Sequence, residues 1–110
     1  MIQETINQIE AAIQNAKSLD EKQKKELVDL ISILSTEILQ LSKTHPEHTQ
    51  SITELTEMLI HEAIRKEKNP QLLQLSLQRL STSVEGFEGS HPKLVGIVNS
   101  LCLALSNVGI

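Results

Sequence analysis

Aliphatic side chains recur at intervals of three and four residues along almost the whole chain, and this spacing restricts the fold more than any other feature. Such spacing places apolar side chains on one face of an α-helix. No segment alternates polar and apolar residues over the length of a strand, and neither Asn-Gly nor Asp-Gly hairpin turns occur. The sequence therefore predicts an all-α fold, a bundle of four to five helices with coiled-coil-like seams.

Helix-starting and helix-ending residues divide the 110-residue chain into five expected helices within a single domain. These helices are predicted to span residues 2–17, 19–43, 47–68, 70–88 and 92–108. Ser18 and Glu21 have the spacing of a capping box, and Asn69-Pro70 is typical of a helix start. Almost no loop is expected between the third and fourth helices, so the two either turn sharply or form one kinked rod.

The charge and the aromatic content exclude one class of partner. The formal net charge is −4, no large cluster of Lys and Arg is present, and the chain has one Phe, no Tyr and no Trp. Binding to nucleic acid needs concentrated cations, and binding to single strands also uses aromatic rings for base stacking. We therefore expect no nucleic-acid partner, and we expect a core that is almost wholly aliphatic.

Cys102 is the only cysteine, which excludes an intramolecular disulfide and suits a reducing compartment. The first residues lack the basic and apolar regions of a secretory signal. The uncharged segment after Lys93 is shorter than the stretch of about 20 apolar residues that a spanning helix needs, and polar residues interrupt it. We therefore expect a cytoplasmic protein with no membrane partner.

The last expected helix, residues 92–108, carries no charged side chain after Lys93. On a helical wheel, its apolar residues cover about half of the circumference. The opposite side carries small neutral residues around Leu103, namely Gly96, Asn99, Ser100, Ser106 and Asn107. Such a surface suits close contact with another helix better than contact with water. Three explanations stay open: a central helix enclosed by its own chain, an interface between copies of the chain, or a groove for a ligand or another protein.

The first expected helix carries a seam of a single residue type, because isoleucine stands at positions 2, 6, 9 and 13. We expect this seam to bury little against its own chain and to pair as a coiled coil, in which isoleucine at both seam positions favours more than two strands. The candidate interface residues are Ile2, Ile6, Ile9, Ile13, Gly96, Asn99, Ser100, Leu103 and Asn107. They predict a non-enzymatic interaction or structural protein that forms a homo-oligomer, a dimer or larger.

His61 is the residue most able to carry a reaction, and it defines an alternative function. It is expected on the polar face of the third helix, one turn after Glu57 and one turn before Arg65. An exposed histidine on a helical bundle resembles the phosphate-accepting site of histidine phosphotransfer domains, because imidazole nitrogen is nucleophilic near neutral pH. Those domains usually carry Lys three residues after the histidine and then Gly, whereas this chain has Ile64 and Arg65. A surface histidine balanced by neighbouring charges is therefore the favoured interpretation.

No motif in the sequence indicates a metal, a cofactor or catalysis. His45 and His48 have a spacing that can chelate a metal, but Pro46 lies between them and structural zinc requires four ligands. Cys102 lies at the edge of the apolar side of its helix, which favours a buried and inert thiol. Gly-rich phosphate loops, His-Glu-x-x-His and nucleophile elbows do not occur. We predict no metal site, no cofactor and no enzymatic activity.

Two stretches of the sequence echo each other at a constant offset. LSTEILQLSKTHP at residues 34–46 and LSTSVEGFEGSHP at residues 80–92 share Leu-Ser-Thr at the front and His-Pro at the back. The residues that follow do not match. A duplicated helical hairpin and a coincidence both explain the echo.

The closing third of the sequence resembles a known family. The resemblance rests on Phe87-Glu88, Ser90-His91-Pro92, Leu94 and the closing stretch Leu105–Ile110. It is specific over residues 69–110 and is a shared helical pattern over residues 1–68. The family consists of short bacterial proteins known only as a domain of unknown function. The resemblance implies a small, helical, cytosolic bacterial protein and supplies no activity, cofactor or catalytic residue.

Overall fold

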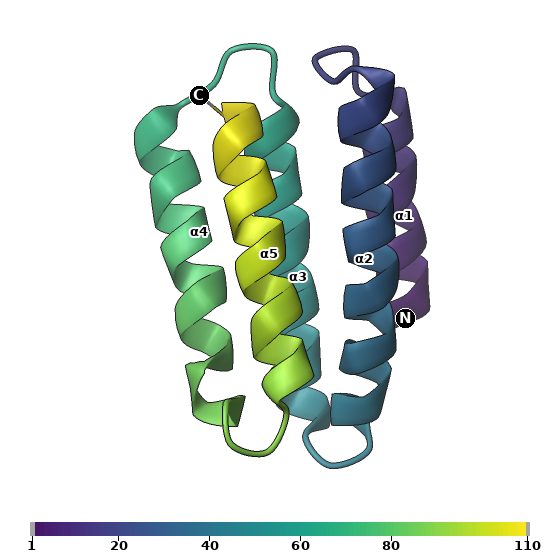
Figure 1. The fold of residues 1–110 in the computed structure, drawn as a ribbon, viewed down its shortest axis with the longest axis vertical. Helices are drawn as coiled ribbons and strands as arrows, with labels where there is room; N and C mark the ends of the chain where they lie inside the picture. Colours follow the sequence, from purple (N-terminus) through teal and green to yellow (C-terminus); the bar gives the residue numbers. More distant parts are fainter. Residues whose placement is uncertain (1, 110) are drawn as a thin grey trace.

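A computed structural model describes residues 2–109, and Figure 1 shows their arrangement as a bundle of helices. Within these residues lie five α-helices, one short 3₁₀ helix and no strand, so the predicted all-α fold is confirmed. The elements are α1 (Ile2–Asn15), α2 (Glu21–Ser42), α3 (Pro46–Ile64), α4 (Pro70–Val84), η1 (Glu85–Phe87) and α5 (Pro92–Gly109). The predicted fourth helix is therefore shorter than expected, because its last turn tightens into η1.

Consecutive helices run in opposite directions and are joined by short loops at the two ends of the bundle (Figure 1). In the described part of the chain, α3 contacts each of the other four α-helices, whereas α5 contacts α2, α3 and α4. The central helix is therefore α3. The interpretation of the last helix as a central one is wrong, because α5 lies on one side of the bundle and covers α3 only from that side.

α3 can occupy the centre because three of its threonines are buried along with its aliphatic residues. Thr49, Thr53 and Thr56 are almost completely inaccessible to solvent. Each hydroxyl donates a hydrogen bond of 2.7–2.8 Å to the carbonyl oxygen four residues earlier, which for Thr49 belongs to the N-cap residue His45. Since the hydroxyl groups are satisfied locally, the small side chains can face the core without the cost of an unpaired polar group.

The hydrophobic residues of the core are aliphatic apart from Phe87, as the composition predicts, and they run the length of the bundle. The seam of α2 that includes Leu27, Ile31 and Leu34 is fully buried. The apolar residues of α2 also predict that Ile33 and Leu39 widen this buried face. That prediction is wrong, because both side chains lie on the outer side of α2 and are about half exposed.

The cap of α2 differs from the predicted one. Asp20, and not Ser18, is the N-cap: its Oδ1 accepts from the backbone N–H of Gln23 at 2.7 Å. The backbone N–H of Asp20 donates in return to Gln23 Oε1 at 3.0 Å, which completes a capping box. Ser18 instead donates its hydroxyl to the carbonyl oxygen of Ile64 at 2.8 Å, so it ties the first loop to the end of α3.

α3 and α4 are two separate helices, which answers the question that the short connection raises. Arg65 leaves the helical conformation, and the chain turns over residues 65–69 before α4 begins. Asn69 caps α4 as predicted, because its Oδ1 accepts from the backbone N–H groups of Gln71 and Leu72, each at 3.1 Å. The sharp turn places α4 antiparallel to α3 (Figure 1).

Candidate functional site

The outer face of α5, defined by Gly96, Asn99, Ser100, Leu103 and Asn107, points away from the bundle. All five residues are exposed, and Leu103, at 66% exposure, is the most exposed large hydrophobic residue among those described. The explanation that the chain itself encloses this helix on all sides is therefore wrong. This face is exposed because α2, α3 and α4 cover only the apolar side of α5.

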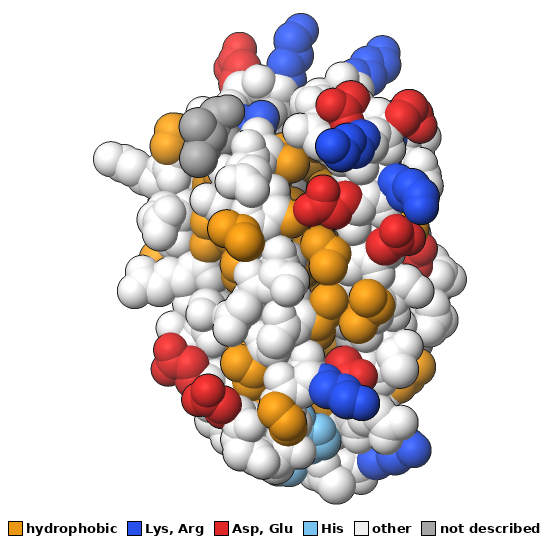
Figure 2. Space-filling view, viewed as in Figure 1, with side chains coloured by type: hydrophobic (Ala, Val, Ile, Leu, Met, Phe, Trp, Pro, Cys, Tyr) orange, Lys and Arg blue, Asp and Glu red, His pale blue; other side chains and the backbone are white. Residues whose placement is uncertain are grey.

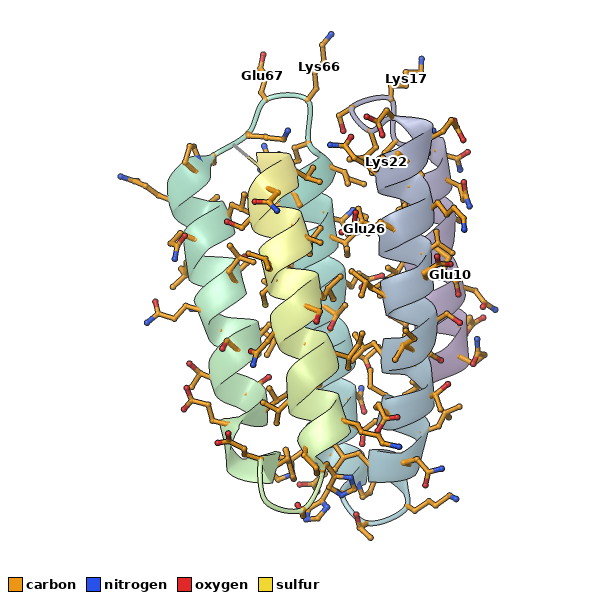
Figure 3. The ribbon with its side chains drawn as sticks, in the orientation of Figure 1. Glu10, Lys17, Lys22, Glu26, Lys66 and Glu67 are labelled. Carbon is orange, nitrogen blue, oxygen red and sulfur yellow. The ribbon has the colours of Figure 1, made fainter. Side chains whose placement is uncertain are left out.

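Charged side chains are absent from this face and frequent beside it. Figure 2 looks onto α5, and the red and blue side chains gather over α2 and at the two ends of the bundle. The charged residues labelled in Figure 3 show the same distribution, since Glu10 stands on α1, Lys22 and Glu26 stand on α2, and Lys66 and Glu67 stand on the loop after α3. The outer face of α5 is therefore exposed and uncharged, in contrast to the charged surface of α2 beside it.

Gly96, Ser100, Leu103 and Asn107 step by four, three and four residues, so they form one straight line along α5. A Cβ atom added at Gly96 would meet nothing within 4 Å, so no contact inside the protomer requires glycine there. Glycine inside a helix lowers its stability by about 0.5–1 kcal/mol relative to alanine. Together with Ser100, it leaves a flat place on the helix where another backbone can approach closely.

The polar groups on this face are not engaged within the protomer. In the part of the chain that the structure describes, the side chains of Asn99, Ser100 and Asn107 form no hydrogen bond. An amide supplies two N–H donors and an acceptor, and a hydroxyl both donates and accepts. These three side chains can therefore form hydrogen bonds with a partner surface of the same kind.

The isoleucine seam of α1 is not part of an exposed site. Ile6, Ile9 and Ile13 are 0–1% exposed, and Ile2 is partly buried. α1 packs against both α2 and α3, which together cover the seam. The expectation that this seam buries little against its own chain is therefore wrong, and these isoleucines are not available for pairing with a second chain.

His61 is exposed, as expected, and lies in an acidic setting. It lines a shallow hollow between α3 and α4 together with Glu57 and Glu62. Arg65 pairs with Glu62, Nη1 to Oε2 at 3.0 Å, and forms no other ion pair with the residues that the structure describes. A phosphoryl group on His61 would lie beside carboxylates, and like charges repel. The surroundings of His61 therefore do not favour the phosphotransfer alternative.

Three of the four histidines surround the single phenylalanine at one end of the bundle, a cluster that the sequence reasoning missed. The Phe87 ring lies 5.2 Å from the ring of His45, 5.4 Å from that of His48 and 6.1 Å from that of His91, all edge to face. Because α2–α3 and α4–η1–α5 both turn at this end, the two His-Pro segments of the internal echo meet there. The His-Pro pair shared by the two echoing stretches was the sequence signal that these two turns have something in common.

The histidine cluster closes the end of the core. Phe87 itself is buried, and the three histidine rings pack against it. Edge-to-face packing is one of the arrangements that aromatic rings prefer. Among the described residues, no group of three or more His, Cys, Asp or Glu side chains is arranged to hold a metal ion.

Cys102 lies beside the outer face of α5 and is half-buried. Its Sγ lies 3.9 Å from the carbonyl oxygen of Leu77 on α4. Burial raises the pKa of the Cys102 thiol above its ordinary value, because the thiolate would lose solvation. A thiol that stays protonated near neutral pH is a weak nucleophile, so Cys102 has the character of a packing residue.

The family assignment comes from residues 34–110, which match the sequence model of a family described as Domain of unknown function (DUF4404). The match covers more than half of the chain. This chain belongs to the DUF4404 family. Neither the comparison with curated proteins nor the comparison with solved structures gives a match.

The DUF4404 match begins inside α2 and continues through α5. It therefore contains both halves of the internal echo, the histidine cluster around Phe87 and the outer face of α5. α1 and the first half of α2 lie outside the match.

None of the helices in the described part of this DUF4404 chain combines the length and the apolar character that crossing a membrane requires.

Proposed function

We propose that this DUF4404 protein is a non-enzymatic interaction protein that associates with copies of itself through the outer face of α5. The observation that carries this proposal is the position of Leu103: it is a two-thirds exposed leucine at the middle of an uncharged line of residues. An association that buries such apolar surface is stabilised by about 25 cal/mol for each Å² removed from water.

An uncharged face is suited to contact with its own copy. In a two-fold symmetric dimer, the same patch occurs on both sides, so a charge near the axis faces an identical charge. The outer face of α5 avoids this repulsion because it carries no charge, whereas its amides and hydroxyl can donate to and accept from the same groups on the copy. Gly96 and Ser100 would let the two helices approach closely at one crossing point.

We also propose a cytoplasmic location, because a chain with a single cysteine cannot form an intramolecular disulfide and suits a reducing compartment.

The test is the mass of the particle in solution. Light scattering after gel filtration at micromolar concentration should give a dimer or larger for the unaltered chain, and the Leu103→Lys variant should give a monomer, because burying an unpaired ammonium group is costly. Leu75→Lys is the matched control, since Leu75 is an exposed leucine on α4 outside this face.

A monomer at every concentration for the unaltered chain would refute the proposal. An equal loss of association in Leu103→Lys and Leu75→Lys would also refute it, because the contact would then not depend on the outer face of α5.

A further inference from the structure

A second exposed apolar surface lies between α3 and α4, away from the outer face of α5. We define the α3–α4 groove by Leu55 and Met58 on α3 and by Leu72 and Leu75 on α4. Met58 is 51% exposed, and Leu72 and Leu75 are each 44% exposed. Leu55 is partly buried and forms the floor.

The groove contains two hollows of about 370 Å³ each, one after the other along the same helix pair. The first lies between Met58 and Leu72, and the second lies between Leu55 and Leu75. Leu55 and Met58 are about one helical turn apart on α3. A helix laid in a groove inserts apolar side chains at positions i, i+3 or i+4, and i+7, so successive hollows along a helix pair match this kind of ligand.

The two walls of the groove carry different charges. On α3, Glu57 and Glu62 line the first hollow, whereas Glu54 lines a hollow on the α1 side of the helix, and α3 has no Lys or Arg within its bounds. α4 contains a single charged residue, Arg79, at the far end of the second hollow. The wall formed by α3 is therefore acidic, and the wall formed by α4 is nearly neutral.

Glu57 is the carboxylate most available to a ligand. Glu62 is already paired with Arg65, and Glu54 accepts a hydrogen bond from Gln50 at 3.3 Å. Glu57 has no ion pair among the residues that the structure describes, although it lines the first hollow. A Lys or Arg on the edge of a bound helix would complement it.

We propose that the α3–α4 groove binds an amphipathic helix of a partner protein that carries Lys or Arg along one edge. Pairing of this groove with that of a second copy would bring two acidic walls together wherever α3 faces α3, which is unfavourable. An anionic lipid surface is repelled by the same carboxylates and would need a basic face. The proposal concerns a different face from the self-association through α5.

The experiment uses two designed helical peptides with the same leucine pattern, one with lysine and one with glutamate at the polar positions. The chain has two methionines, so labelling their methyl groups for NMR gives a signal from Met58 inside the groove. The leucine–lysine peptide should shift the Met58 signal and bind at least about tenfold more tightly than the leucine–glutamate peptide, because of the acidic wall. The measurement is made in the Leu103→Lys background, in which association through α5 is not expected. The result therefore does not depend on whether the self-association proposal is correct.

Variants separate the groove from general attraction to an acidic protein. Glu57→Lys should lower the affinity for the leucine–lysine peptide by about tenfold. Glu10→Lys on α1 makes the same change in net charge and should leave this affinity unchanged. Leu72→Gln should also lower the affinity, whereas Leu39→Gln should have no effect, although Leu39 on α2 is similarly exposed.

Equal binding of both peptides, an unshifted Met58 signal, or equal effects of Glu57→Lys and Glu10→Lys would overturn the proposal. A Met58 shift that depends on protein concentration without any peptide would also overturn it, because a second copy would then occupy the groove.

Discussion

Gly96 lowers the stability of α5 without serving a contact inside the protomer. Its backbone is helical and a side chain there would point into open space, so alanine fits without strain. We expect Gly96→Ala to raise the free energy of unfolding by about 0.5–1 kcal/mol, because alanine restricts the unfolded chain and favours the helix. Urea unfolding in the Leu103→Lys background, where association is not expected, measures this effect.

The same substitution should act in the opposite direction on association. If α5 crosses a copy of itself at Gly96 and Ser100, an added methyl group separates the two backbones and weakens the dimer. A variant that lowers the stability of the protomer would contradict the open space around Gly96.

Single residues also show what the sequence allows one to predict. The spacing of apolar residues in α3 predicts an inner face made of Ile52, Leu55, Leu59 and Ala63. Ile52, Leu59 and Ala63 are buried, and Leu55 is partly buried. The buried threonines of α3 were not predicted, because residue type alone counts a hydroxyl as polar. Only the helix itself brings each hydroxyl to the carbonyl four residues earlier and removes that polarity from the core.

At the scale of elements, the N-cap of α2 can be tested by removing its side chain. Asp20→Ala removes the side chain that accepts from Gln23, and we expect a loss of about 0.5–2 kcal/mol in the free energy of unfolding. Asp29→Ala is the matched control, because Asp29 is an exposed aspartate inside α2 with only a surface ion pair to Lys25, and such pairs are worth about 0–1 kcal/mol. Thermal or urea unfolding of both variants gives the comparison.

A larger loss of unfolding free energy in Asp29→Ala than in Asp20→Ala would contradict the assigned cap.

The sequence offers two possible caps for α2. Ser18 and Asp20 both stand three residues before a side chain able to complete a capping box, Glu21 for Ser18 and Gln23 for Asp20. Sequence spacing could not separate these two starts. The structure does so because the hydroxyl of Ser18 is used by the carbonyl of Ile64, more than forty residues away in the chain.

The isoleucine seam of α1 shows a second limit at this scale. A line of isoleucines at heptad spacing fits a coiled coil between chains and a groove between two helices of the same chain equally well. The distinction depends on α2 and α3, which form that groove. The seam therefore predicted a helix and its buried face correctly, but it could not identify what covers that face.

For the whole molecule, the contribution of α1 can be tested by its removal. A chain that begins at Ser18 lacks three fully buried isoleucines and exposes the parts of α2 and α3 that they cover. Burying such a side chain is worth about 1.5–3 kcal/mol, and the total stability of a small domain is about 5–15 kcal/mol. We expect the shortened chain to lose its cooperative thermal transition, as followed by circular dichroism.

An unchanged and sharp transition would show instead that the region matched by the DUF4404 family is stable with little help from α1.

The arrangement of the helices is the part of the fold that the sequence predicts least well. Five helices could be counted from their spacing and breaks. Which of them is central, and which turns meet at one end, depends on the order of packing and not on the pattern within any one helix.

The ring of Phe87 has a practical consequence for the study of this molecule. Because the chain contains neither Tyr nor Trp, its near-ultraviolet dichroism reports mainly on this one ring and therefore on one end of the bundle. The far-ultraviolet signal, in contrast, averages over every helix. Comparing the two during heating would show whether the bundle opens first at the histidine end, because transitions that coincide indicate two-state unfolding and transitions that separate indicate fraying from that end.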